Sequence, residues 1–172
     1  MHMTNHELII NSTGISAFDS FNGEYSSKAI EICDLLMQFQ IKIVHDYDSL
    51  FAEDVMREND AFGYYLDKGS YNASGTYAEI IVNVSMCKRL CLTDAEMLAA
   101  VAHEVGHIIL FFHEKKAWSH GDGEEMQCDD YACKMGLKEE MVSLLNKMID
   151  SGEYEQEKTE CFRRRIEYIL LV

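Results

Sequence analysis

The sequence contains no proline, a single tryptophan, and half as many basic as acidic side chains. Without proline, the 172 residues lack the side chain that most readily breaks a helix, which favours a largely helical fold. The 15 Lys and Arg against 30 Asp and Glu give a formal net charge of −15. Nucleic acids and anionic membrane surfaces repel a chain of this charge. We therefore expect no nucleic-acid partner, whereas a basic or neutral polypeptide is compatible with the charge.

Long apolar runs are also missing. No run reaches the roughly 20 apolar residues of a membrane-spanning helix. Residues 1–25 carry neither the basic nor the apolar segment of a secretory signal. The six cysteines include no C-x-x-C pair, which argues against a structural zinc site built on cysteines. We expect a cytoplasmic protein without a membrane span, in which most cysteines are reduced and buried.

The length suits one domain with its own core. Residues 1–25 are polar and contain glycine, and we interpret them as an N-terminal arm before a folded domain over residues 26–172. Apolar residues recur at helical spacing over residues 26–45 and 137–150, which predicts a helix in each. We also expect helices over residues 48–59 and 155–171.

Two segments are rich in β-branched and aromatic residues and predict strands, over residues 62–66 and 76–84. The loop between them, residues 67–75, is rich in turn-forming residues, so the two strands could pair as an antiparallel hairpin. We therefore predict an α+β fold: a mostly helical single domain with a small, mainly antiparallel sheet beside a long central helix.

That helix carries the most informative motif, His103-Glu104-Val105-Gly106-His107. The two histidines are four residues apart, so they share one face of a helix. Two neutral imidazoles supply half of a tetrahedral zinc site, and Glu104 can reach a water on the metal without being a ligand. Helices rich in Glu and His also produce this pattern by chance, as two satisfied polar positions. The surrounding sequence must decide between these interpretations.

The sequence before the motif predicts a well-formed, packed helix. Thr93 and Glu96 have the spacing of a capping box. An apolar stripe follows and carries the histidines into the interior, where an unpaired polar group is costly. Gly106 costs about 1 kcal/mol relative to alanine inside a helix, so we expect another element to approach it closely. The stripe consists of Leu98, Val101, Ala102, Val105, Ile108, Ile109 and Phe112.

A third ligand is available downstream. Glu125 and Asp129 are four residues apart on a second predicted helix. We expect Asp122 to cap the start of this helix and Gly136 to end it. Glu125 can point at the metal, and Asp129 can accept the N–H of a zinc-bound histidine. The alternative is a solvated acidic helix face, which is common in a chain this acidic.

The predicted strand over residues 76–84 precedes the motif helix. A strand in this position is often the edge along which an extended peptide is laid. We expect the substrate to contact this strand through Ile80, Ile81, Val82, Asn83 and Val84.

These features resemble the catalytic core of the gluzincin metallopeptidases, over roughly the last two thirds of the chain. The segment from Glu125 to Ala132 is similar to the E-x-x-A-D-x-x-A segment of the HtpX and CAAX-prenyl-protease type, with Cys128 in place of its alanine. Arg165-Ile166 resembles the C-terminal R-I of that type. The resemblance implies one Zn²⁺ per chain, held by His103, His107 and Glu125, with Glu104 as catalytic base.

The chain also departs from that type. It has no transmembrane helices, and Glu160-Cys161 stands where the membrane proteins often have His-Pro. The short gap between His107 and Glu125 is nearer to the soluble ImmA/IrrE type. The oxyanion-stabilising residue is left open among four candidates. These are Tyr131, His120, Tyr154 and Arg165.

The expected function is that of a soluble zinc-dependent peptidase acting on a peptide or protein substrate. The alternative is a non-catalytic or latent protein that keeps the zincin fold as a regulatory or interaction module. Glu104 argues against the alternative, because a purely structural zinc site has no use for a base and usually closes its fourth position with a protein ligand.

Overall fold

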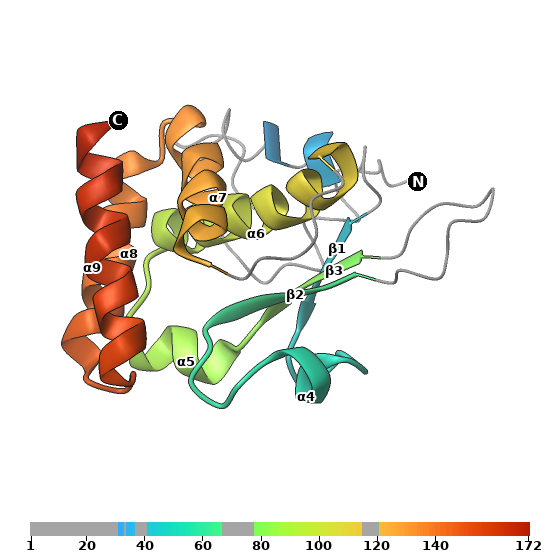
Figure 1. The fold of residues 1–172 in the computed structure, drawn as a ribbon. Coiled ribbons are helices and arrows are strands. Elements are labelled where there is room, and N and C mark those ends of the chain that lie inside the picture. The colour runs from blue at the N-terminus through green and yellow to red at the C-terminus, as the bar shows by residue number, and fades with distance from the viewer. Residues whose placement is uncertain (1–30, 33, 37–40, 67–77, 115–120) are drawn as a thin grey trace. The chain divides into compact units, whose positions relative to one another are not determined.

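A computed structural model describes residues 31, 32, 34–36, 41–66, 78–114 and 121–172 (Figure 1). The fold is α+β as predicted, mostly helical with a small three-stranded sheet. The chain divides into two compact units, Met1–Ser85 and Met86–Val172. All the described strands lie in the first unit and the four long helices in the second. The predicted arm over residues 1–25 falls outside the described residues.

The first unit contains the sheet, in the order β1-β3-β2. Its strands are β1 (Ile41–His45), β2 (Phe62–Leu66) and β3 (Ala78–Val82). β2 and β3 pair antiparallel, which confirms the predicted hairpin, while β1 pairs parallel with β3. The sheet is therefore mixed rather than mainly antiparallel.

The strand β1 corrects the helix predicted over residues 26–45. Residues 31, 32 and 34–36 are helical, but Ile41–His45 is extended. Ile41 and Ile43 are buried while Lys42 between them is exposed, which is the alternation of a strand. The β-branched isoleucines favour this conformation. The helix predicted over residues 48–59 is confirmed only as the single turn α4 (Ala52–Val55).

One face of the sheet is covered from within the first unit. Phe51 stacks on Tyr65 of β2 with their ring centroids 3.7 Å apart, and Met56 lies over Gly63, where a Cβ would come within 2.9 Å of its Cγ. On β3, buried Glu79 accepts a hydrogen bond from Ser49 Oγ at 2.8 Å. These contacts explain why a glycine and a carboxylate are tolerated within the sheet.

The strand β3 does not provide the predicted peptide-binding edge. It lies in the middle of the sheet, with β1 bonded along one side and β2 along the other. Its backbone groups are thus already committed, and no described part of Ile80–Val82 can accept another strand. The strand is also shorter than predicted: Asn83 follows it, and Val84 begins the helix α5 (Val84–Arg89).

The second unit is built from four long helices. Helix α6 packs against α7 and α8, and α9 packs against both α7 and α8. Helix α8 ends at Gly152, whose left-handed conformation (φ 67°) favours glycine. The predicted helices over residues 137–150 and 155–171 are confirmed within one residue at each end. The four helices are α6 (Asp94–Glu114), α7 (Asp122–Lys134), α8 (Lys138–Ser151) and α9 (Gln156–Leu171).

The capping box at the start of α6 is confirmed. Thr93 N donates to Glu96 Oε2 at 2.7 Å, and Glu96 N donates to Thr93 Oγ1 at 3.2 Å. Glu96 also accepts hydrogen bonds from Ser143 Oγ and Lys147 Nζ of α8, at 2.6 and 2.7 Å. One buried carboxylate therefore caps α6 and ties it to α8.

Within the described part of the chain, no helix combines the length and apolar character needed to cross a membrane.

The start of α7 differs slightly from the prediction. Gly121 occupies the cap position and Asp122 is the first helical residue. The Asp122 carboxylate accepts a hydrogen bond from Arg164 Nε of α9 at 2.6 Å. Asp122 therefore connects two helices instead of capping its own.

Candidate metal centre

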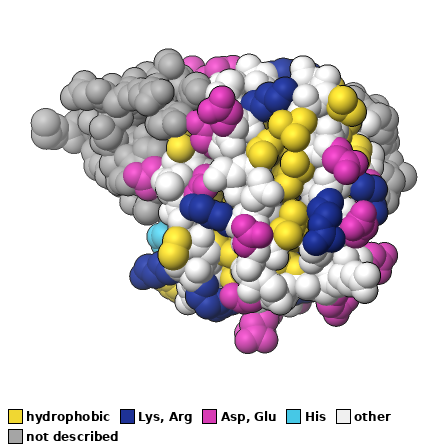
Figure 2. Space-filling view, turned by 90° about the vertical axis from the view of Figure 1, so that its left-hand side faces the viewer, with side chains coloured by type: hydrophobic (Ala, Val, Ile, Leu, Met, Phe, Trp, Pro, Cys, Tyr) yellow, Lys and Arg dark blue, Asp and Glu magenta, His cyan; other side chains and the backbone are white. Residues whose placement is uncertain are grey.

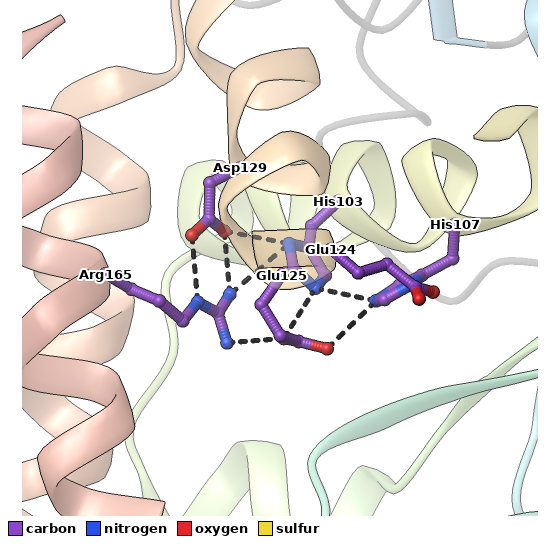
Figure 3. A network of polar contacts seen from close by, with 6 residues as sticks. All are labelled: His103, His107, Glu124, Glu125, Asp129 and Arg165. Atoms are coloured by element: carbon purple, nitrogen blue, oxygen red, sulfur yellow. Dashed lines mark hydrogen bonds and ion pairs between the residues drawn. The ribbon is translucent and has the colours of Figure 1, made fainter. Parts of the chain in front are cut away.

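Three side chains converge at the junction of α6 and α7 (Figure 3). The Nε2 atoms of His103 and His107 are 3.2 Å apart. The Glu125 carboxylate places Oε2 at 3.4 Å from Nε2 of His103 and Oε1 at 3.3 Å from Nε2 of His107. The two histidines are buried and Glu125 is partly exposed. The predicted donors are thus brought together as a group that could hold a metal ion.

The close packing of α6 on α7 makes this convergence possible. A Cβ on Gly106, between the two histidines, would lie 3.0 Å from Cα of Cys128 and 3.0 Å from Cδ2 of Tyr131. Such distances are shorter than normal van der Waals contact. Gly106 therefore allows α7 to lie close to α6, as the sequence analysis predicted from the presence of a glycine inside the helix.

Asp129 makes the predicted contact with His103. Its Oδ1 accepts a hydrogen bond from Nδ1 of His103 at 2.8 Å, and its side chain is fully buried. With the ring proton on Nδ1, the lone pair of Nε2 points towards the other donors, which is the orientation a metal ligand requires.

His107 has an equivalent partner that the sequence analysis did not assign. Its Nδ1 lies 3.1 Å from Oε1 of Glu124, the residue before Glu125. Each candidate ligand histidine is therefore oriented by a carboxylate on α7. The sequence offered only a weak signal for Glu124, because several acidic residues stand in the same turn.

Arg165 of α9 joins the two carboxylates on α7. Its Nε and Nη2 donate to Oδ2 and Oδ1 of Asp129, at 2.8 and 2.7 Å, and its Nη1 donates to Oε2 of Glu125 at 2.8 Å. The side chain is buried. Arg165, a candidate for oxyanion stabilisation, thus donates its hydrogen bonds to the candidate ligand Glu125 and to Asp129 in this structure.

The neighbouring arginines behave differently, as an exposed basic cluster would. Arg163 pairs with Glu160 at 3.2 Å, and Arg164 pairs with Asp122 at 2.6 Å, with all four side chains well exposed. Figure 2 shows a face on which acidic and basic side chains are interspersed in this way. Such pairs contribute little to stability.

The charges of the centre favour a bound cation. Burial alone would raise the pKa of the Glu125 and Asp129 carboxyls, but His103 and Arg165 outweigh it and lower both. Burial and the charge of Arg165 lower the pKa of His103, yet Asp129 and Glu125 raise it to about 9 overall. The two carboxylates therefore stabilise a positive charge on His103, and they would stabilise a cation bound at the same place in the same way.

Glu104 lies beside the donors on α6 and is buried. Burial raises the pKa of its carboxyl, the histidines oppose this, and the negative charge of Glu125 adds to it. No described residue forms a hydrogen bond or ion pair with the Glu104 carboxylate. The group can therefore take up and release a proton close to the cluster.

The separations of the donors fit a tetrahedral ion. Zinc bonds of about 2.0–2.2 Å place two ligands of a tetrahedron about 3.3–3.5 Å apart. The two Nε2 atoms, 3.2 Å apart, lie near this range, and each has a different oxygen of Glu125 close by: Oε2 at 3.4 Å from His103 and Oε1 at 3.3 Å from His107. Two imidazoles and one carboxylate are also a donor set that zinc accepts.

Comparison with known proteins gives no match among family models, curated proteins or solved structures.

None of the other predicted site residues that the structure describes is one of the three converging donors. Tyr131 packs beside Gly106, with Lys134 Nζ 5.7 Å from its ring centroid. Tyr154 is buried with its ring edge against Phe162. His120 falls outside the described residues. The predicted substrate strand, Ile80–Val84, belongs to the first unit or to the start of α5.

Proposed function

We propose that this chain is a zinc-dependent peptidase of the gluzincin type. The observation that carries the proposal is the convergence of His103, His107 and Glu125 at 3.2–3.4 Å, next to a buried glutamate, Glu104, that is not one of the three donors. A closed structural zinc site has four protein ligands, whereas three ligands leave a position for water or substrate.

Zinc bound by these residues would supply Lewis acidity, which polarises a peptide carbonyl and lowers the pKa of water. Asp129 and Glu124 hold the two imidazoles with Nδ1 as donor, which directs the lone pair of each Nε2 at the ion. Glu104 takes the proton of the attacking water and passes it to the leaving amine. Its raised pKa suits this role, because a base works best when its pKa approaches the working pH.

The proposed substrate is a peptide or protein, and the proposed cofactor is one zinc ion per chain. Of the four candidates for stabilising the oxyanion, Arg165 already donates to Asp129 and Glu125 in this structure.

The test compares wild type with Glu104→Gln, which keeps the size of the side chain and removes its basic carboxylate. Zinc content is measured first, and cleavage of a broad peptide library is then measured at equal zinc occupancy. We expect about one zinc in each protein, and a loss of cleavage of roughly 10²–10⁴-fold in the variant.

Equal cleavage by the two proteins would remove Glu104 from the mechanism. Zinc binding without any cleavage by wild type would favour the non-catalytic or latent zincin-fold protein instead. Stoichiometric zinc retained in the double variant His103→Ala/His107→Ala would contradict the metal site itself.

A further inference from the structure

Arg165 contacts two carboxylates of the candidate metal centre through different atoms of its guanidinium group. Nε and Nη2 donate to Asp129, while Nη1 donates to Glu125. Figure 3 shows the planar group from α9 lying across the two side chains, which are one helical turn apart on α7. Because the donors of a guanidinium are fixed in one plane, the contact with Asp129 also sets the position of Nη1.

The contact makes the two oxygens of Glu125 different. Each oxygen lies near one histidine, Oε2 at 3.4 Å from Nε2 of His103 and Oε1 at 3.3 Å from Nε2 of His107, but Arg165 donates only to Oε2, at 2.8 Å. A divalent cation on Oε2 would share that oxygen with the positive guanidinium group, and the two charges would repel each other. The same cation on Oε1 would bind the oxygen to which Arg165 does not donate.

We propose, building on the zinc site proposed above, that Arg165 is a positioning residue that keeps Glu125 a ligand through one oxygen, Oε1. A carboxylate that binds through both oxygens occupies two coordination positions. Binding through one oxygen leaves the additional position open, as a catalytic zinc site requires. Arg165 thus acts on the reaction through the coordination number and not by touching the substrate.

A simpler role for Arg165 is to neutralise the buried carboxylate of Asp129. That role predicts an effect on folding but none on how Glu125 binds the metal. Removing Arg165 alone would leave Asp129 buried without its cation, which could unfold the protein. The test therefore uses Asp129→Asn, which removes the buried charge, with and without Arg165→Met.

The measurement is the coordination of zinc by X-ray absorption, together with the visible spectrum of the cobalt(II)-substituted protein. In Asp129→Asn the amide oxygen can still accept from Nδ1 of His103 and Nη2 of Arg165, and only the bond from Nε, which would face the amide nitrogen, is lost; the bond from Nη2 still holds Nη1 at Glu125. We expect wild-type coordination there. In Asp129→Asn/Arg165→Met we expect about one additional oxygen ligand and a weaker cobalt absorption, as four-coordinate metal becomes five-coordinate. Identical coordination in the two variants would overturn the proposal.

Arg164→Met is the matched control. Arg164 precedes Arg165 on α9 and also pairs with an aspartate of α7, but this pair with Asp122 is exposed. We expect unchanged coordination in this variant. An effect equal to that of the double variant would mean that any lost arginine contact between α9 and α7 perturbs the site, and would overturn the specific role of Arg165.

The zinc-loaded wild type provides a test that depends on no variant. In its crystal structure, zinc bound to Oε1 alone would support the proposal, and zinc bound to both oxygens of Glu125 would overturn it. If the wild type retains neither zinc nor cobalt, the proposed function fails. If it binds metal but the coordination does not depend on Arg165, only the present inference fails.

Discussion

At the scale of single residues, the candidate centre is a pair of matched contacts. Asp129 orients His103 and Glu124 orients His107, each through Nδ1. The spacing of four predicted that His103 and His107 share one helix face and that Glu125 and Asp129 share another, while the meeting of the two faces was implied by the resemblance to the gluzincins. Glu124 could not be assigned in this way, because several acidic residues stand in the first turn of α7 and spacing alone does not show which of them contacts His107.

The role of Glu124 can be tested directly. Because its carboxylate orients the imidazole of His107, Glu124→Ala should weaken zinc affinity roughly 10–100-fold while leaving the helix content unchanged. Competition with a chromophoric chelator measures the affinity. Glu139→Gln, a change at an exposed glutamate on α8, is the control and should have no effect. Equal affinities of Glu124→Ala and wild type would show that Glu124 does not support the metal ligand.

At the scale of helices and strands, the centre depends on how closely α7 approaches α6. The sequence predicted a close approach at Gly106, and α7 provides it. It could not show that Ile41–His45 is a strand, because Ile41 and Val44 also fit helical spacing and only pairing with β3 selects the extended form. For the same reason β3 was expected at an edge. Its partner β1 is distant in sequence, and no local pattern reports such a pairing.

The glycine of the interface offers a matched pair of substitutions. Gly106→Ala would force its new Cβ against the α7 backbone at Cys128, and we expect it to lower the free energy of unfolding by about 1–3 kcal/mol. Gly123 is helical and a Cβ added there would meet no atom within 4 Å, so Gly123→Ala should be neutral or stabilise by up to about 1 kcal/mol. Urea denaturation measures both. Equal effects of the two changes would contradict the close packing at Gly106.

The contact between α6 and α8 predicts a pH dependence of stability. Burial would raise the pKa of Glu96, but hydrogen bonds from Lys147, Ser143 and Thr93 outweigh it and lower the pKa. A carboxyl with a lowered folded pKa stabilises the fold above its unfolded pKa, near 4.3, and this contribution is lost as the pH falls through the folded value.

The expected result is that Glu96→Gln is less stable than wild type at pH 7, and that the difference shrinks as the pH falls below about 4. Denaturant unfolding at several pH values provides the measurement. Glu157→Gln, at an exposed position in the first turn of α9, is the control and should show no such trend. A difference in stability that stays constant down to pH 3 would contradict the lowered pKa.

At the scale of the whole molecule, the donors are unevenly distributed. His103, His107, Glu125 and their partners all belong to the second unit, and the described part of the first unit contributes none of them. Sequence patterns predicted the helices of the second unit well, since their apolar faces and the capping box of α6 are local signals. They predicted the sheet of the first unit less well, because its order depends on contacts between distant segments.

This distribution predicts where zinc bound at the proposed site would change the hydrogen-exchange protection of the backbone. A ligand that binds only the folded state stabilises the part of the structure that supplies its contacts. Hydrogen exchange measured with and without zinc should therefore slow in α6, α7 and α9, and change little in β1, β2 and β3. Equal slowing in both units would show that zinc stabilises the chain as one cooperative whole.

The order of the donors along the chain has a consequence for how the protein folds. His103 and Glu125 come from consecutive helices, so bringing them together closes only a short loop and costs little chain entropy. Arg165 reaches the same carboxylates only after α8 and α9 have formed and docked. Contacts between residues close in sequence form sooner than distant ones. We expect α6 and α7, which carry the candidate metal ligands, to pack together early, and Arg165 to form its contacts with them last.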